Sequence, residues 1–141
     1  MNNFFIVIIA SILFFSSSCE TDGPSYDASY KVINNSEHKI DLKMFNQGLI
    51  SDSLRLLYSE FKEYLCSSRA GVSDPPPFLA DSLKVFFDDT ISITHYRIEE
   101  QIALRSLLLK KSWSGGQVSE YDYNYKYIFT ETDYNEVLDN Q

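Results

Sequence analysis

Apolar side chains recur at every second position in several short segments of this chain, and this period of two constrains its fold more than any other feature. Between residues 39 and 44, Ile40, Leu42 and Met44 alternate with two lysines and an aspartate. Residues 82–97 and 121–129 repeat the pattern. Because successive side chains of a β-strand point to opposite faces, each segment is predicted to be a strand with one buried and one solvated face.

Turn-forming residues separate these strands. Asn34-Asn35-Ser36 lies between two β-rich runs and predicts a hairpin over residues 30–45. Asp88-Asp89-Thr90 predicts the turn of a second hairpin over residues 82–97. With the long strand at 121–129, the pattern indicates about seven short strands, a number typical of a small β-sandwich.

Residues 53–68 allow two interpretations. Helical spacing is shared by five of the apolar residues, namely Leu54, Leu57, Tyr58, Phe61 and Leu65. The alternative is two strands joined by a turn at 58–60, with Leu54 and Leu56 on one face and Tyr64 and Cys66 directed inward. Since the neighbouring segments on both sides are β, we predict two strands.

The C-terminal third contains two further segments. Residues 98–112 are rich in Leu and Ile, so they form either a short helix over 99–109 or a loop that closes one end of the core. After the strand ending at Phe129, Thr130 is predicted to cap a short helix through Leu138. Asp133 stands three residues after this cap, where a capping box has its acidic residue.

The first nineteen residues have the pattern of a targeting signal. An apolar run of about 12 residues precedes Ser16-Ser17-Ser18 and then Cys19. A bilayer-spanning helix needs roughly 20 apolar residues, whereas the core of a secretion signal is of this shorter length. Three small residues followed by cysteine resemble the lipobox of bacterial lipoproteins. That resemblance implies cleavage before Cys19 and acylation of Cys19; an ordinary secretion signal or an uncleaved anchor are the alternatives.

These signals divide the chain into a lipoprotein signal peptide at 1–18, a flexible tether at 19–29 and a β-sandwich domain at 30–141. The formal net charge is −8, and every charged side chain lies after Ser18. Such an acidic surface repels a phosphate backbone, so no nucleic-acid partner is expected. Membrane association is therefore expected to come from the lipid on Cys19. Glu20 and Asp22 also bear a weak likeness to the surface-export signals of some lipoproteins.

At this level the chain resembles small lipoproteins of unknown function from Gram-negative bacteria, which have immunoglobulin-like or related β-sandwich domains. The resemblance lies in Cys19, in the run 30–35, in the hairpin arm 81–89 and in the closing run 127–134. It implies an immunoglobulin-like antiparallel β-sandwich of about seven strands with a short C-terminal helix, located at the outer membrane. It carries over no active site.

Chemistry-bearing residues are sparse. A nucleophilic serine would need a positioned base, and the two histidines, His38 and His95, are expected in a turn and a strand. Three aspartates, Asp81, Asp88 and Asp89, lie near turns without calcium-loop spacing and are interpreted as turn formers. Cys66 has no partner once Cys19 is lipidated and is interpreted as a small buried residue. We therefore expect no catalytic residue, no metal and no cofactor.

Aromatic residues are the best candidates for partner binding. Tyr121, Tyr123 and Tyr125 fall on one face of the last strand, where they form either half-buried packing or an exposed platform. Trp113, between two serines, is either an exposed anchor or a residue folded back over the edge of the core.

The favoured function is that of a lipid-anchored, non-enzymatic binding or accessory module for a protein or glycan partner in the cell envelope, on either face of the outer membrane. One alternative is an inhibitor or immunity-type lipoprotein, whose acidic surface would cover a cationic enzyme. The other is a hydrolase, which would need His38 or His95 beside a carboxylate and a hydroxyl.

Overall fold

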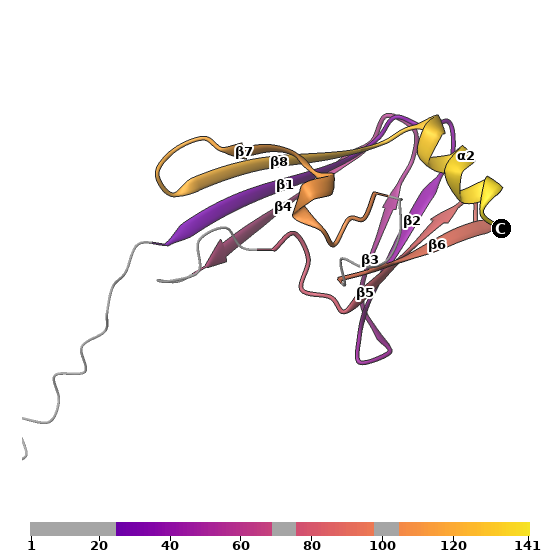
Figure 1. Cartoon of the computed structure of the whole chain (residues 1–141), viewed down its shortest axis with the longest axis horizontal. Helices are drawn as coiled ribbons and strands as arrows, with labels where there is room; N and C mark the ends of the chain where they lie inside the picture. Colours follow the sequence, from indigo (N-terminus) through magenta and orange to yellow (C-terminus); the bar gives the residue numbers. More distant parts are fainter. Residues whose placement is uncertain (1–24, 69–75, 98–104) are drawn as a thin grey trace, which may run out of the picture.

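The computed structural model of the protein describes residues 25–68, 76–97 and 105–141. In these ranges, eight strands form two four-stranded sheets, followed by one short α-helix (Figure 1). Sheet 1 has the strand order β4-β1-β8-β7, and sheet 2 has the order β3-β2-β5-β6. The elements are β1 (Tyr26–Asn34), β2 (Ile40–Asn46), β3 (Leu49–Leu56), β4 (Phe61–Ser68), β5 (Ser82–Phe87), β6 (Ile91–Tyr96), the 3₁₀ turn η1 (Lys110–Ser112), β7 (Ser114–Gln117), β8 (Asp122–Phe129) and α2 (Glu131–Asp139).

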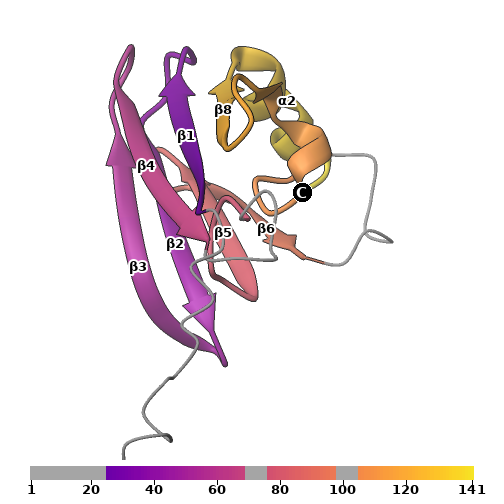
Figure 2. The same cartoon turned by 90° about the vertical axis from the view of Figure 1, so that its left-hand side faces the viewer.

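The first four strands are one long hairpin bent across both sheets. β2 and β3 pair antiparallel in sheet 2, and the chain on either side of them continues into sheet 1 as β1 and β4, which also pair antiparallel. The β5–β6 hairpin then pairs with β2, and the β7–β8 hairpin pairs with β1, with β8 running parallel to β1. Figures 1 and 2 show the two sheets meeting at the bend and diverging away from it.

The predicted hairpin over residues 30–45 is wrong, because its two strands lie in different sheets. Residues 35–39 carry the chain around the bend, and no strand pairing joins β1 to β2. β1 also begins at Tyr26, inside the segment expected to be tether. The prediction of strands rather than helix in residues 53–68 is confirmed, although β3 and β4 likewise belong to different sheets.

Asn34 is the hinge of the bend, which we call the corner (residues 34–39 and 57–60). Its side chain is fully buried, and its amide nitrogen donates to the carbonyls of His38 at 2.8 Å and Leu56 at 3.3 Å. Its amide oxygen accepts from the backbone N–H of Ser36 at 3.0 Å and from the Ser36 hydroxyl at 2.8 Å. The Asn34 backbone bonds to Ser59 and Glu60 on the other crossing chain, each at 2.9 Å. One residue thus holds both chains of the bent hairpin.

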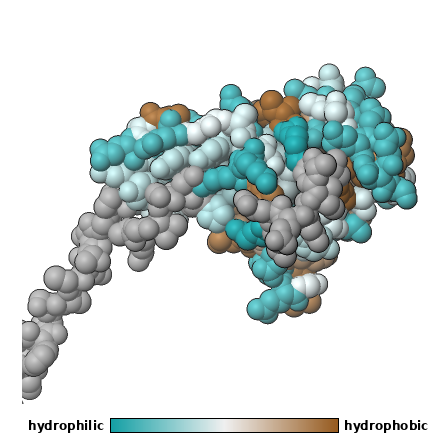
Figure 3. All heavy atoms as spheres, in the orientation of Figure 1, coloured by the Kyte–Doolittle hydropathy of each residue, from teal (hydrophilic) through white to brown (hydrophobic). Residues whose placement is uncertain are grey.

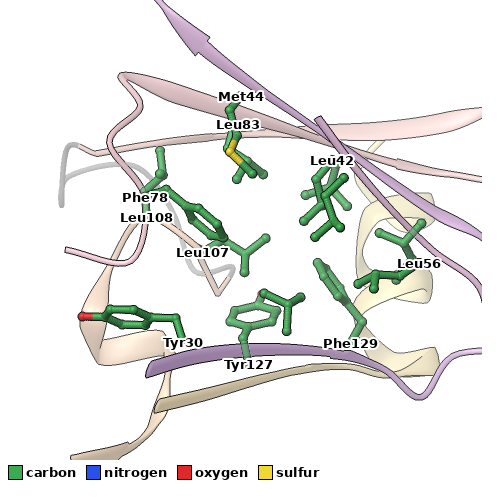
Figure 4. Close-up of a cluster of buried hydrophobic side chains, with 14 of the residues drawn as sticks. Tyr30, Leu42, Met44, Leu56, Phe78, Leu83, Leu107, Leu108, Tyr127 and Phe129 are labelled. Carbon is green, nitrogen blue, oxygen red and sulfur yellow. The ribbon is translucent and has the colours of Figure 1, made fainter. Parts of the chain in front are cut away.

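The core lies between the two sheets and follows the alternation seen in the sequence. Inward side chains of β1 and β8 face those of β2, β3 and β5 across the interior (Figure 4). The largest fully buried side chains are aromatic and branched aliphatic residues, led by Tyr30, Tyr127, Phe87, Phe129, Ile40, Leu42, Leu56 and Leu83.

Two irregular segments fill the space where the sheets diverge. Phe78 comes from the chain before β5, and Leu107 and Leu108 come from the chain before η1; all three are buried (Figure 4). Of the two alternatives for residues 98–112, the loop holds in residues 105–109, where no α-helix forms. Residues 98–104, the rest of that predicted segment, lie outside the described residues.

The C-terminal helix and its cap are confirmed. α2 begins after Thr130, whose backbone N–H and hydroxyl donate to the Asp133 carboxylate at 2.8 and 2.9 Å. This capping box satisfies backbone donors at the start of the helix. Val137 is buried, and α2 contacts β6, so the helix covers the end of the interior beside the corner.

The architecture is a β-sandwich-like pair of sheets, with a strand order of its own. In immunoglobulin constant-type domains the first two strands share a sheet, whereas β1 and β2 are in different sheets here. The eighth strand, beyond the seven expected, is β7, a segment without apolar alternation that was not expected to be a strand. Its Gly115 has φ of +117° and lies so close to β8 that an added Cβ would be 2.1 Å from the Asn124 carbonyl oxygen.

Replacing the hinge side chain tests the corner. Asn34→Ala should lower the free energy of unfolding by about 3 kcal/mol, because it leaves buried carbonyls and the Ser36 hydroxyl without their partner. Chemical denaturation of the purified full-length protein measures the change. Asn124→Ala, on the exposed face of β8, is the matched control and should change stability by less than about 0.5 kcal/mol. Equal stability of the two variants would contradict a central role for Asn34.

Candidate functional site

Trp113 is a core residue rather than an exposed anchor. Its side chain is only 7% exposed, and its ring packs against Tyr30 and Tyr127, with centroids 5.2 and 5.5 Å apart. Its indole N–H donates to the Leu107 carbonyl at 3.0 Å. The alternative interpretation, a residue folded over the edge of the core, therefore holds. The divergence of the sheets explains this, because the space between them needs large side chains.

The tyrosine face of β8 is graded from exposed to buried. Tyr121 is 37% exposed, Tyr123 is half-buried and Tyr125 is 9% exposed. Tyr125 stacks on Tyr30 at 5.0 Å, and Tyr123 continues the stack at 6.2 Å from Tyr125. This face packs inward, so Tyr125 offers no free platform. Tyr121 and Tyr123 lie at the outer end of the stack.

His95 is buried in the interior. Its Nδ1 accepts the backbone N–H of Leu107 at 3.1 Å, and burial lowers the pKa of the imidazole to about 4. The ring is therefore neutral at physiological pH and ties the core-closing loop to β6. No hydroxyl contact to this ring is present in the described residues, so its geometry is that of a structural residue.

His38 sits at the corner between two carboxylates. Its Nδ1 is 2.6 Å from Asp88, its Nε2 is 3.4 Å from Glu131, and its ring stacks on Tyr134 with centroids 3.5 Å apart. The hydrogen bond from His38, with a second from the Lys39 backbone N–H, lowers the pKa of Asp88. This set joins the β1–β2 link to the β5–β6 turn and to α2. In the described residues it includes no hydroxyl nucleophile, which the hydrolase hypothesis requires.

The three aspartates near turns have structural partners. Asp81 accepts the Gln47 backbone N–H at 2.8 Å, and Asp89 pairs with the Lys39 ammonium. Asp88 and Asp89 have positive φ values of 50° and 60°, a conformation that Asp tolerates in turns. Among the residues that the structure describes, no three His, Cys, Asp or Glu side chains are placed to hold a metal ion.

Of the two cysteines, the structure describes Cys66 but not Cys19. Cys66 is half-buried on β4 without a disulfide, and burial raises the pKa of its thiol, which suits a packing residue rather than a reactive one. Cys19 and the signal segment lie outside the described residues. Within residues 25–68, 76–97 and 105–141, no helix has the length and apolar content of a membrane span.

The outer face of sheet 2 is the most distinctive polar surface. One row of outward side chains crosses all four strands and is named here the lysine row: Ser53 on β3, Lys43 on β2, Lys84 on β5 and Thr94 on β6. The aromatic side chains of Phe86 and Tyr96 lie in the neighbouring rows. A depression of about 530 Å³ opens at one side of this face, where Lys43, Ser53 and Phe86 line it together with Asp41, Arg55 and Asp89.

Lys43 and Lys84 are directly opposite each other on adjacent strands. Both ammonium groups lie 5.0 Å from the centroid of the Phe86 ring. In the described part of the chain, neither lies within 4.0 Å of a carboxylate. Like charges at directly opposed positions are destabilising, so the pair is an unneutralised positive site on a chain of net charge −8.

The other cations on this face are already paired. Arg55 binds Asp41 at 2.7 Å, and Lys39 binds Asp89 and lies 3.5 Å from Asp41. Among the described residues, the two lysines thus differ from Arg55 and Lys39 in lacking a carboxylate within 4.0 Å, and both lie near the ring of Phe86. Chemically, the lysine row can bind an anionic group between the ammonium groups, with a hydroxyl at each end of the row and an aromatic surface beside it.

The sequence contained part of this site. Lys43 and Lys84 both occupy the solvated positions of alternating segments, which predicts that each faces water. Their register could not be inferred, because β2 and β5 are separated by two other strands and a connection. Only the pairing of these two strands brings the two charges together.

Comparison with protein-family models, with curated proteins and with solved structures found no match to this chain.

The burial of His95 predicts a pH-dependent stability. Between pH 6.5 and about 4, His95 is protonated in the unfolded chain but stays neutral in the folded chain. The free energy of unfolding should therefore be highest above pH 6.5 and fall as the pH is lowered. The loss attributable to His95 should reach about 3 kcal/mol near pH 4. Chemical denaturation at several pH values compares the wild type with His95→Asn, which keeps an acceptor for Leu107 but does not titrate. The free energy of unfolding should depend less steeply on pH in the variant. Identical slopes would contradict a buried neutral imidazole.

Proposed function

We propose that this protein is a lipid-anchored, non-enzymatic binding module of the outer membrane, and that the lysine row binds an anionic glycan. The acyl chains on Cys19 hold it at the membrane, on the periplasmic face or at the cell surface. The likeness to immunoglobulin-like domains that we propose concerns the two packed sheets and does not extend to their strand order.

One observation carries the binding proposal, namely the opposed Lys43–Lys84 pair on a solvated sheet face. Directly opposed like charges repel each other in the free protein, and both ammonium groups lie 5.0 Å from the centre of the same ring. A carboxylate, sulfate or phosphate placed there would offset the repulsion and form charge-assisted hydrogen bonds.

The surroundings favour a glycan over a protein partner. Protein interfaces are depleted in Lys at their centre, whereas Lys43 and Lys84 are at the centre of this face. Ser53 and Thr94 add hydroxyls that exchange hydrogen bonds with sugar hydroxyls. Phe86 lies on one side of the row and Tyr96 on the other, so both can pack against the apolar faces of sugar rings.

Lipidation of Cys19 is tested by mass spectrometry of the full-length protein purified from its native host. The expected product begins at Cys19 and carries two or more acyl chains, which give stable anchoring where one chain would not. Cys19→Ser should release the protein from the membrane fraction. A product that starts at Met1, or one cleaved without fatty modification, would overturn the anchor.

Glycan binding is tested with Lys43→Gln/Lys84→Gln and polygalacturonate, a carboxylated polysaccharide. Wild-type protein should bind it with an affinity that falls with added salt, and the double variant should lose roughly tenfold or more, because two charge-assisted contacts are removed. Neutral dextran should not bind.

The matched control is Lys62→Gln/Lys126→Gln, which removes the same charge from exposed positions in sheet 1. Its affinity should equal that of the wild type. An equal loss of affinity in both double variants would show that the effect comes from net charge and not from the lysine row. Tighter binding of polyglutamate than of polygalacturonate would assign the face to an acidic polypeptide instead.

A further inference from the structure

The turn of the β2–β3 hairpin is an exposed apolar point. Residues 45–51, here called the hairpin tip, contain no charged side chain, although 23% of the chain is charged. Leu49 and Ile50 are 75% and 59% exposed. Leu79, from the segment before β5, is 82% exposed. In Figure 3 the tip projects from the body of the domain and carries hydrophobic atoms beside polar ones.

Hydrogen bonds join the segment that carries Leu79 to the hairpin tip. The Asn46 amide donates to the Leu79 carbonyl at 2.9 Å, and the Gln47 backbone N–H donates to Asp81 at 2.8 Å. The Asp81 backbone N–H in turn donates to the Phe45 carbonyl at 2.9 Å. The segment carrying Leu79 is therefore fastened beside the tip. Leu49 and Ile50, as consecutive residues of β3, point to opposite faces of the hairpin, so the tip exposes an aliphatic side chain on each face.

We propose that the hairpin tip, with Leu79 beside it, inserts into the lipid surface that holds the acylated Cys19, so that the domain is attached at two points. The inference rests on the proposed lipid anchor. Its occupant is the lipid bilayer itself, since exposed Leu and Ile on an uncharged loop match the chemistry of the headgroup–acyl boundary.

Chain length keeps the domain close to that surface. Tyr26, where β1 begins, follows Cys19 by seven positions, and a chain of that length spans at most about 25 Å. β1 runs toward the corner and β2 runs away from it, so the start of β1 and the hairpin tip both lie at ends remote from the corner. Figures 1 and 2 show both far from α2, with the start of β1 at the end of sheet 1 and the hairpin tip at the end of sheet 2, where the two sheets have diverged.

The absence of charged side chains in residues 45–51 favours the tip over other parts of the domain as the membrane contact. The domain is acidic overall and is repelled by anionic headgroups. Residues 45–51 themselves add no negative charge, and the tip gains free energy from each aliphatic side chain removed from water.

The experiment uses full-length, lipidated protein reconstituted in vesicles of phosphatidylethanolamine and phosphatidylglycerol, with and without brominated acyl chains that quench tryptophan on contact. The wild type, whose one tryptophan is the buried Trp113, supplies the baseline. Ile50→Trp adds a reporter at the tip. Leu138→Trp is the control, because Leu138 is 47% exposed but lies on α2.

Brominated lipid should quench at least half of the emission added by Ile50→Trp and leave that added by Leu138→Trp unchanged. Adding Leu49→Ser and Leu79→Ser to Ile50→Trp should relieve the quenching, since two of three apolar side chains are lost. If the emission added by Ile50→Trp stays unquenched on protein whose acylation is confirmed by mass spectrometry, this inference is overturned while the anchor stands. Quenching of the α2 reporter instead would show that the opposite end faces the lipid.

Discussion

A buried amide governs how this chain folds over itself. The Asn34 side chain satisfies both of its polar ends at the point where β1 stops and the chain turns toward β2. A polar group buried without partners costs free energy, so any other path of the corner would leave the Asn34 amide unsatisfied and be less stable. The same residue bonds through its backbone to the link between β3 and β4. Both chains of the long hairpin therefore bend at one level and distribute their strands between two sheets.

The bend explains why aromatic residues lie in the interior. Sheets that meet at one end and diverge at the other leave a space that short side chains cannot fill at the density of a protein core. Tyr30, Trp113, Tyr125 and Tyr127 fill it with edge and stacked ring contacts, and Leu107 closes it from the irregular segment. Two of the residues that suggested a binding surface, Trp113 and Tyr125, thus serve packing.

The strand register of sheet 2 determines which side chains meet on its outer face. Strand pairing in sheet 2 places Lys43 opposite Lys84, and the neighbouring pairing of Asp41 with Arg55 neutralises the row beside it. A shift of one residue would move every side chain to the other face. The proposed glycan face and the apolar hairpin tip are therefore both products of how β2 is paired, one on its solvated side and one at its end.

Local pattern determined much of this protein. Alternation at 40–44, 83–87 and 123–129 predicted the strands and which side chains are buried, because the period of two depends only on backbone geometry. The Thr130–Asp133 cap was likewise predictable, since it acts within one turn of helix. Tertiary structure alone decided that Asn34 makes a corner instead of a hairpin turn, that Trp113 lies inside, and that two lysines from distant segments meet. These outcomes depend on contacts between residues far apart in the chain, and a short-range pattern holds no information about which strands will pair.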